Sequence, residues 1–542
     1  MPLYRVPIVA CVALLLLGAM SYRVLRTQSA PVVKRIRWFW AIYAALQGAI
    51  LGMVAGNHLT FPLNLEFMES TVLQHVARLS AGQPIYADPS PGFVALAYNP
   101  LFYAVCVPFA RWLGMGMMSI RLPAVLASLG VGLVMFLIVR KRTGSRWWGG
   151  MAVGLFASAY RVMDCYLDVG HRDSLLLLAI LGGFWCLDRG GWFRSLAGML
   201  LLAAGFWLKQ QGALFLGIGL WHVLRRYPWR RGIPVSLFGL ALGPALYILA
   251  PDSWWGPRLH YFTYEVPTAW TAFQWVELSN LMRLMTWHYG VLLTAAVWWW
   301  VDSFSLVRTW QAPADTMGIW RVALPGALLS GVAAMMSPGS NNNVYIPMGG
   351  VLIVVGTIAL ARMGEMEGQG RRWCYSLLSL SFASLVYLPA SVLRDASPKK
   401  SYADLTEMLR TLDGPVYAPG LGPLFTPPGP QIRQTPLAHI VPIADMVRGP
   451  GRDEQASRAV RRILHAVESP PHPAYILAHS KLEEEAALAF LAPRYRLEAD
   501  FQNRFEPLAT LPARHGHLYP RYLYRSVSPP NEGPLAARGA SR

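Results

Sequence analysis

The chain has 542 residues, of which 54% are hydrophobic and only 14% are charged. This composition excludes an ordinary soluble globular protein, in which about 25% of the residues are charged. The formal net charge of +19 could indicate a nucleic-acid partner. The basic residues instead cluster in short segments beside apolar runs, as the positive-inside rule of membrane proteins describes.

The first apolar run, within residues 1–22, follows Arg5 and resembles the core of a signal peptide. Cleavage and export are disfavoured by the next segment, because a loop with many cations prefers the cytoplasm. The cations of this loop are Arg23, Arg26, Lys34, Arg35 and Arg37. We therefore predict that residues 1–37 form an extra N-terminal span, with its N-terminus outside, followed by a basic cytoplasmic loop.

Further apolar runs approach or reach the 17 to 25 residues, roughly, that a membrane-spanning helix needs. The sequence predicts a polytopic α-helical membrane protein with about 12 spans. These are residues 6–22, 38–58, 119–139, 147–164, 173–188, 195–208, 211–224, 233–250, 285–301, 319–337, 346–362 and 373–392. The short pair 195–208 and 211–224 could form a hairpin that crosses only partly. Segment 98–114 contains two prolines and Arg111, and we interpret it as an interfacial helix on the external surface.

With these spans, cations accumulate in the loops on one side of the membrane. The predicted cytoplasmic loops include Arg140, Lys141, Arg142, Arg189, Arg225, Arg226, Arg362, Arg371 and Arg372, and the predicted external loops hold far fewer. The asymmetry places the first large loop, residues 59–118, outside.

After Leu393 the sequence becomes polar and rich in proline. Residues 393–526 are predicted to form a small extracytoplasmic α/β domain. Its expected elements are helices over 401–412, with Ser401 as N-cap, and 452–468, and strands over 415–419 and 474–478. The composition of residues 527–542 predicts disorder.

The first large loop carries two carboxylates, Glu66 and Glu69, in front of a predicted amphipathic helix over 69–81 that Gly82 terminates. Both would tend toward the buried face of that helix, where a carboxylate is retained for chemistry or for a specific partner. The competing interpretation is that they only stabilise the helix N-terminus through its dipole.

A second polar cluster joins two apolar helices at residues 164–173. It contains Asp164, Asp168, His171, Arg172 and Asp173. The triplet His171-Arg172-Asp173 matches the kinase catalytic triplet only in letters, because no glycine-rich nucleotide loop accompanies it.

Two further polar segments interrupt the later spans. Lys209-Gln210 lies at the turn of the short hairpin, where the lysine either snorkels to the interface or binds an anion such as a lipid phosphate. Residues 337–345, which contain three consecutive asparagines, are explained by turn chemistry.

The order of several motifs resembles bacterial members of the GT-C superfamily of membrane glycosyltransferases, which includes protein O-mannosyltransferases and the aminoarabinose transferases of lipid A. The motifs are the acidic loop, Gly82-Gln-Pro-Ile-Tyr86, Tyr98-Asn-Pro-Leu-Phe-Tyr103, Ile120-Arg121-Leu122-Pro123, Arg172-Asp173-Ser174-Leu175 and Leu208-Lys209-Gln210. The resemblance covers residues 38–392.

This resemblance implies a GT-C-like catalytic transmembrane domain in the bacterial plasma membrane. It implies an inverting transfer of a sugar from a polyprenyl-phosphate donor to an envelope lipid, glycan or protein at the outer membrane surface. The carboxylate base falls on Glu69, with Glu66 as the alternative, and Asp173 matches the second acidic position. Lys209, Arg172 and Gln210 would bind the donor phosphate, with Asp168, His171 and Tyr98 in supporting positions.

Two other functions remain open from the sequence: a transporter or flippase of a lipid-linked sugar, and a non-catalytic membrane scaffold. The absence of repeated halves and the few charges within spans argue against a transporter. No cofactor is indicated with certainty. A divalent metal stays open, because His58, His75 and His171 lie near the expected site without metal-ligand spacing.

Overall fold

The computed structural model describes part of residues 12–19 and residues 30–88, 93–271, 273–305, 317–336, 341–366, 369–394, 397–414, 416–418, 474–484, 489–511 and 518–527. Most of the predicted first span over 6–22, all of the predicted helix over 452–468, and the tail 527–542 apart from Val527 lie outside these residues. The stated domain boundaries remain predictions.

The described part of the chain up to residue 394 is helical. It contains α2 (Ala30–Leu59), α3 (Glu69–Ser80), α4 (Leu101–Leu113), α5 (Met117–Thr143), α6 (Arg146–Ser158), α7 (Asp173–Arg189), α8 (Trp192–Leu208), α9 (Gly212–Arg226), α10 (Trp229–Leu240), α11 (Leu246–Ile248), α12 (Asp252–Trp255), α13 (Val266–Trp270), α14 (Trp275–Arg283), α15 (Gly290–Ser305), α16 (Trp320–Ala334), α17 (Ile346–Glu365) and α18 (Gln369–Leu385). Short π-helical turns join α10 to α11, α14 to α15, and precede α13.

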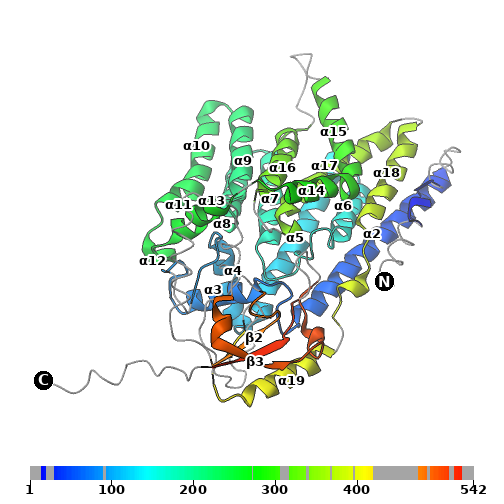
Figure 1. The fold of residues 1–542 in the computed structure, drawn as a ribbon. Helices are drawn as coiled ribbons and strands as arrows, with labels where there is room; N and C mark the ends of the chain where they lie inside the picture. Colours follow the sequence, from blue (N-terminus) through cyan, green and yellow to red (C-terminus); the bar gives the residue numbers. More distant parts are fainter. Residues whose placement is uncertain are drawn as a thin grey trace.

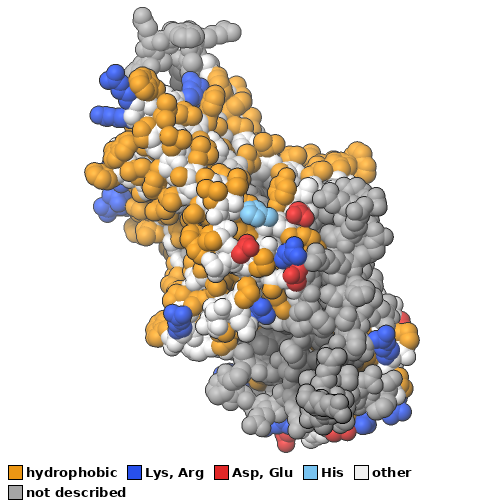
Figure 2. All heavy atoms as spheres, turned by 90° about the vertical axis from the view of Figure 1, so that its left-hand side faces the viewer, with side chains coloured by type: hydrophobic (Ala, Val, Ile, Leu, Met, Phe, Trp, Pro, Cys, Tyr) orange, Lys and Arg blue, Asp and Glu red, His pale blue; other side chains and the backbone are white. Residues whose placement is uncertain are grey.

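Five of these helical stretches are long and apolar enough to cross a membrane: Pro31–Leu59, Met117–Thr143, Trp229–Ile248, Asn342–Glu365 and Arg372–Ser391. Shorter apolar helices accompany them, so the described chain has the helices of a multi-pass membrane protein. Figure 2 shows a face on which hydrophobic side chains cover most of the described surface of the helix bundle. The count of about twelve spans stays a prediction.

Helix α17 is the centre of the bundle, with 94% of its most apolar stretch buried. Two of its glycines explain how its neighbours approach so closely. A Cβ atom on Gly350 would lie 2.5 Å from Leu177 of α7, and one on Gly356 would lie 2.9 Å from Leu292 of α15. Small residues at such positions let helix backbones pack together in a membrane, where van der Waals contact drives association.

The helix predicted over 147–164 is shorter than expected. Helix α6 ends at Ser158, and a series of turns over residues 159–172 connects it to α7. Asp164 and Cys165 in these turns adopt left-handed backbone conformations, with φ of 50° and 65°. Such conformations cost a non-glycine residue roughly 1–3 kcal/mol and gather at functional sites.

The C-terminal residues form α19 (Ser397–Arg410) and a four-stranded sheet in the order β1-β2-β4-β3. The strands are β1 (Val416–Tyr417), β2 (Tyr475–Ala478), β3 (Tyr495–Asp500) and β4 (Tyr522–Ser526); β1 pairs parallel with β2, and the other pairs are antiparallel. The N-cap predicted at Ser401 is wrong, because α19 starts four residues earlier and Ser401 lies within it.

The sheet and α19 lie below the helix bundle, beside α3 and one end of α2 (Figure 1). Backbone hydrogen bonds attach them to the first loop: Leu511 N donates to Leu65 O at 2.8 Å. The Asn57 side chain donates to Arg394 O and accepts from Arg394 N, both at 2.7 Å. The C-terminal sheet therefore packs against the loop that carries Glu66.

Candidate active site

The predicted helix of the first loop is α3, which begins at Glu69 and ends at Ser80, one residue before the predicted end. Gly82 has a φ of 69°, as a helix-terminating residue at this position requires. Glu66 lies in the turn before the helix and is 4% exposed, while Glu69 is completely buried. Both carboxylates are therefore enclosed, as the sequence periodicity predicted.

Glu69 is bound by Arg121 of α5. Arg121 Nε donates to Glu69 Oε1 at 2.8 Å, and Arg121 Nη2 donates to Oε2 at 2.7 Å. The backbone N–H groups of Gly170 and Leu65 each donate to the same carboxylate at 2.7 Å. Burial alone would raise the pKa of Glu69, but the charge and hydrogen bonds of Arg121 outweigh it and hold this pKa below its ordinary value.

Arg121 also fixes the course of the first loop. Its guanidinium donates to the carbonyl oxygens of His58 at 2.9 Å and Phe61 at 2.6 Å, and to that of Leu63. Glu69 and Arg121 thus form a buried ion pair with every oxygen and most donors occupied. Such a pair holds a loop in place and leaves no carboxylate oxygen unoccupied for a substrate.

Glu66 has a different environment. Its Oε1 accepts a hydrogen bond from the Tyr166 hydroxyl at 2.8 Å, and its Oε2 accepts one from Met68 N at 2.9 Å. Burial raises the pKa of Glu66 to about 8, against the opposing effect of the Tyr166 hydrogen bond. Glu66 is therefore protonated more readily than an exposed glutamate.

The second polar cluster is assembled around Asp173, the first residue of α7. Lys209 Nζ donates to Asp173 Oδ1 at 2.8 Å, and Asn343 Nδ2 donates to Oδ2 at 2.9 Å. His171 Nδ1 also donates to Oδ2. The structure thus brings together the predicted residues His171 and Asp173, from the start of α7, and Lys209, from the turn before α9.

Arg172 is completely buried beside this cluster. Its Nη2 donates to His171 Nε2 at 2.7 Å, and its guanidinium carbon lies 3.0 Å from the centroid of the Tyr98 ring. Burial and the Arg172 charge lower the pKa of His171 to about 4, so this ring is neutral and its Nδ1–H faces Asp173. Within the described chain, Arg172 Nε and Nη1 have no hydrogen-bond partner.

A buried guanidinium with two unused donors is costly unless an anion binds to it. The Tyr103 hydroxyl lies close to Arg172, whose charge acts on it. Arg172 further interacts electrostatically with Glu66 and with Lys209. Arg172 is therefore close enough to both Glu66 and Lys209 for their charges to interact.

Two predicted residues have mainly supporting contacts. The Gln210 amide nitrogen donates to the carbonyl oxygens of Ala97 at 3.0 Å and Thr263 at 2.8 Å, which ties the hairpin turn to two loops. The Tyr98 ring covers Arg172, and its carbonyl oxygen accepts a hydrogen bond from the Tyr86 hydroxyl.

Asp168 belongs to a separate buried group. It accepts a hydrogen bond from the Tyr160 hydroxyl at 2.9 Å and lies 2.8 Å from His58 Nδ1, while His58 Nε2 lies 2.8 Å from Val392 O. His75 is also occupied, with Nδ1 donating to Thr71 O at 2.7 Å and Nε2 accepting from Leu96 N at 3.1 Å. Among the described residues, no group of three or more His, Cys, Asp and Glu side chains is placed to hold a metal ion.

Sequence reasoning missed three members of the site. Tyr166 links Glu66 to Asn341, whose Nδ2 donates to the Tyr166 hydroxyl at 2.9 Å. The interpretation of the asparagine segment as turn chemistry is incomplete, because the Asn341 and Asn343 side chains are buried in the site. Three asparagines between two apolar helices were the available signal, since a simple turn does not need buried amides.

No protein-family model matches the sequence, and no curated protein matches it. Among solved structures, the fold is similar to ArnT from Cupriavidus metallidurans bound to undecaprenyl phosphate, with 12% identity, a TM-score of 0.47, and coverage of 90% of this chain and 98% of that one. It is also similar to the Archaeoglobus fulgidus oligosaccharyltransferase in complex with Zn and sulfate, with 12% identity, a TM-score of 0.45, and coverage of 84% and 68%.

A third similar structure is the arabinosyltransferase EmbB from Mycobacterium smegmatis, with 15% identity, a TM-score of 0.38, and coverage of 78% of this chain and 37% of that one. All three are GT-C glycosyltransferases. Because these TM-scores lie below 0.5, the function proposed below rests on the chain's own residues.

Proposed function

We propose that the chain is an inverting glycosyltransferase that moves a sugar from a polyprenyl-phosphate donor to a hydroxyl group of an envelope acceptor. The observation that supports this most strongly is the pair Glu66 and Arg172. A buried carboxylate with a pKa of about 8 interacts with a buried guanidinium that has two unused donors. This combination offers a base and an anion site within one enclosed network.

In the proposed reaction, the ionised Glu66 carboxylate accepts the proton of the acceptor hydroxyl while that oxygen attacks the anomeric carbon. The bond between this carbon and the phosphate oxygen breaks, and its electron pair stays on the phosphate. A positioned base contributes about 10²–10⁴-fold to such a step. Attack from the face opposite the phosphate inverts the anomeric centre.

The phosphate gains one negative charge when the sugar leaves, and Arg172 and Lys209 stabilise that charge electrostatically. The neutral His171 ring, fixed by Asp173, accepts a hydrogen bond from Arg172 and thereby orients the guanidinium. Burial lowers the pKa of Lys209, and the carboxylate of Asp173 counteracts this effect. Asp173 therefore keeps Lys209 cationic and correctly placed, without contacting the substrate itself.

We place Glu69 in a positioning role and Glu66 in the role of base. Glu69 binds Arg121 through both oxygens and receives two backbone hydrogen bonds, whereas Glu66 receives one hydrogen bond on each oxygen. The motif resemblance favoured Glu69 because its sequence position is typical of the family. The environment of the two carboxylates favours the reverse assignment.

The position in the membrane supports an external site. The candidate site lies at the ends of α7 and α9 that begin with Asp173 and Gly212, and the cation-rich ends at Arg189 and Arg226 lie opposite. Under the positive-inside rule, the cation-rich ends face the cytoplasm. The site and the C-terminal sheet then lie on the extracytoplasmic side of the plasma membrane.

The function is tested with purified protein, a labelled polyprenyl-phosphate sugar and a delipidated envelope extract as acceptor source. Formation of a labelled product that requires Glu66 supports the transferase. Movement of the labelled lipid across vesicles without product formation would instead indicate a flippase, and wild-type glycans after deletion of the protein would indicate a scaffold.

A further inference from the structure

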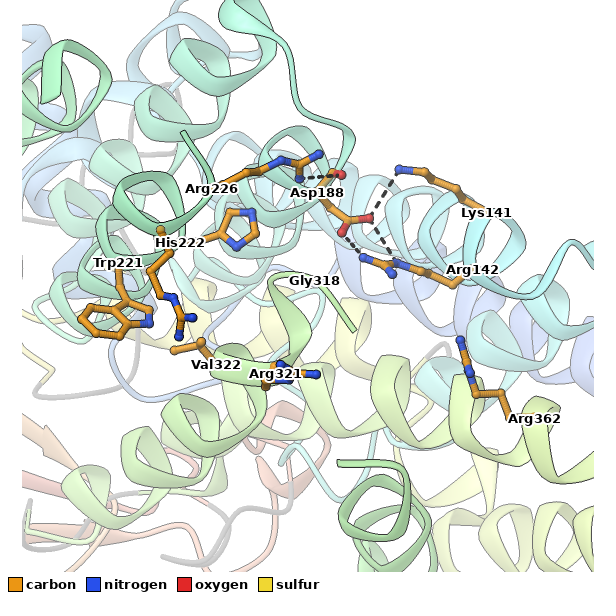
Figure 3. Close-up of a pocket in the computed structure, with 11 residues that line it drawn as sticks. Lys141, Arg142, Asp188, Trp221, His222, Arg226, Gly318, Arg321, Val322 and Arg362 are labelled. Atoms are coloured by element: carbon orange, nitrogen blue, oxygen red, sulfur yellow. Dashed lines mark hydrogen bonds and ion pairs between the residues drawn. The ribbon is translucent and has the colours of Figure 1, made fainter. Parts of the chain in front are cut away.

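A cavity of about 680 Å³ opens between α5, α7, α9, α16 and α17 (Figure 3). Its described walls are strongly basic: Lys141, Arg142, Arg225, Arg226, Arg321 and Arg362 line it, and Asp188 is the one carboxylate among the described lining residues. With His222 counted as neutral, these described residues carry an excess of five positive charges. The volume is within the range of small-molecule sites, roughly 300–1,000 Å³.

This cavity is separate from the candidate active site. Asp173 begins α7 in the active site, and Asp188 lies 15 residues later in the same helix. At about 1.5 Å per residue, the two lie about 22 Å apart along the helix axis. Helix α9 repeats this arrangement, because Gly212 follows Lys209 at one end and Arg226 lines the cavity at the other.

Some of the cations have structural partners. Arg142 binds Asp188 through Nε at 3.2 Å and through Nη2, and Lys141 Nζ lies 3.5 Å from the same carboxylate. Arg226 Nη1 donates to the carbonyl oxygens of Leu187 and Asp188, at 3.0 and 3.1 Å, which completes the C-terminal end of α7.

Two arginines are left without a counter-charge in the described part of the protein. Arg225 and Arg362 form no ion pair with any described carboxylate, and their guanidinium groups lie 5.9 Å and 5.1 Å from the rings of Trp221 and Trp299. The Arg362 Nε atom makes no hydrogen bond within the same residues. Figure 3 shows Arg362 pointing into the space that Arg142 borders from another helix.

The backbone at Gly318 lies directly against the basic side of this cavity. Gly318 has a φ of 59°, and a Cβ atom there would lie 2.5 Å from Arg142 Nη2 and 2.8 Å from Asp188 Oδ1. The chain therefore passes directly against the Arg142–Asp188 pair, which a larger residue would displace. The general preference of Lys and Arg for cytoplasmic loops explains how many basic residues lie at this end of the helices. It does not explain why they line a cavity.

We propose that this cavity binds a phosphate-bearing anion, and that an anionic lipid headgroup with two phosphates fills it. The five surplus positive charges repel one another, and a bound multivalent anion reduces this repulsion. The anion also accepts hydrogen bonds from the arginine N–H groups that have no other partner. Basic pockets between spanning helices at the cytoplasmic boundary suit such headgroups, whose acyl chains stay in the adjacent lipid.

The test uses the full-length protein in detergent and measures its melting temperature with added phosphatidylcholine, with added cardiolipin, and with the soluble anion glycerol bisphosphate. Cardiolipin that co-purifies with the protein is quantified by mass spectrometry. The variant is Arg225→Gln with Arg362→Gln, which leaves the Arg142–Asp188 pair and the helix-end contacts of Arg226 unchanged. The control is Arg230→Gln with Arg231→Gln, which removes equal charge from residues that do not line the cavity.

Cardiolipin is expected to raise the melting temperature of the wild type and of the control, and to do so less at high salt. The double variant should bind it more weakly by about fivefold for each lost arginine. Stabilisation by glycerol bisphosphate alone, lost in the double variant, would uphold the anion site and identify a soluble ligand. Equal cardiolipin retention and equal stabilisation in all three proteins would overturn the proposal. No transferase assay enters this test.

Discussion

The Tyr166 hydroxyl donates a hydrogen bond to Glu66 Oε1 at 2.8 Å. A tyrosine from the turns before α7 thus binds one oxygen of a carboxylate on the first loop. The same hydroxyl accepts a hydrogen bond from Asn341 Nδ2, and the Tyr166 ring lies 5.2 Å from the His171 ring. The first loop, the turns over 159–172 and the asparagine segment are thereby joined in one buried network.

Replacement of the proposed base should remove transfer without unfolding the protein. Glu66→Gln is expected to lower the transfer rate by about 10²–10⁴-fold, because the amide cannot accept the hydroxyl proton. The measurement is product formation from a labelled polyprenyl-phosphate sugar, with the melting temperature as a check of folding. A Glu66→Gln protein that transfers at the wild-type rate would contradict the assignment.

The pH dependence provides an independent check of the same residue. Only the ionised carboxylate acts as base, and burial raises the pKa of Glu66 to about 8. The wild-type rate should therefore rise with pH through about 8, and fall again at higher pH as Lys209 loses its proton. Glu66→Asp should keep a rising limb with a lower maximum, whereas a wild-type rate that is flat from pH 6 to 9 would exclude Glu66 as the titrating group.

Substitution of Arg172 should show whether this residue binds a ligand or only supports the fold. Arg172→Met removes a buried charge with two unused donors, so the melting temperature should stay equal or rise, because burial of such a charge is unfavourable. Donor affinity should fall by about 10- to 100-fold, the loss expected for one or two hydrogen bonds to a charged group.

The measurement for Arg172 is the KM for the donor together with direct binding of undecaprenyl phosphate. Arg258→Gln is the matched control, because Arg258 pairs with Asp88 on the surface. Arg172→Lys should recover only part of the affinity, since lysine lacks the planar guanidinium that both binds His171 and covers Tyr98. A drop in melting temperature with unchanged KM would assign Arg172 a structural role instead.

Local signals in the sequence predicted most helices well. The helix at 69–81, the span at 119–139 and the span at 346–362 each differ from α3, α5 and α17 by a few residues. Their apolar periodicity and terminating residues are properties of neighbouring positions. The left-handed turn at Asp164 and Cys165 escaped prediction, because it depends on contacts with a distant segment, such as the hydrogen bond from Asn342 N to Asp164 Oδ2 at 2.7 Å.

At the candidate site, too, local features could be predicted and contacts between distant segments could not. The types of residue were readable, since acids and cations beside apolar helices are unusual. Which carboxylate binds which cation was not readable, because Glu69 meets Arg121 across 52 positions and Glu66 meets Tyr166 across 100. Strands β3 and β4, which pair with each other, were also missed.

The Glu69–Arg121 pair should contribute to stability more than to proton transfer. Glu69→Gln leaves Arg121 buried without its counter-charge, and removal of one partner of a buried pair costs about 3–5 kcal/mol. The melting temperature should fall clearly, whereas Asp88→Asn at the surface pair with Arg258 should change stability by about 1 kcal/mol or less. Since the pKa of Glu69 is lowered by folding, this contribution is present above the ordinary glutamate range and is lost only as the pH falls below it.

A double-mutant cycle over Glu69→Gln and Arg121→Gln checks this assignment, because the double variant removes both charges and should recover part of the lost stability. If Glu69→Gln instead kept the wild-type melting temperature and abolished transfer, Glu69 would be the base, as the motif resemblance implied.

The Asn343 amide should be sensitive to added charge. Its Nδ2 donates to Asp173 Oδ2 at 2.9 Å inside the network that holds Lys209. Asn343→Asp would place two buried carboxylates in contact, which costs several kcal/mol unless one becomes protonated. The expected result is weaker donor binding that improves at lower pH, where the second carboxylate binds a proton and donates to Asp173 in place of the amide.

The matched control is Asn342→Asp, which adds the same charge one residue away, where Asn280 donates to the side chain at 2.8 Å. If both variants bound the donor equally well at every pH, Asp173 would not be part of the donor site, because only the first variant alters its contacts.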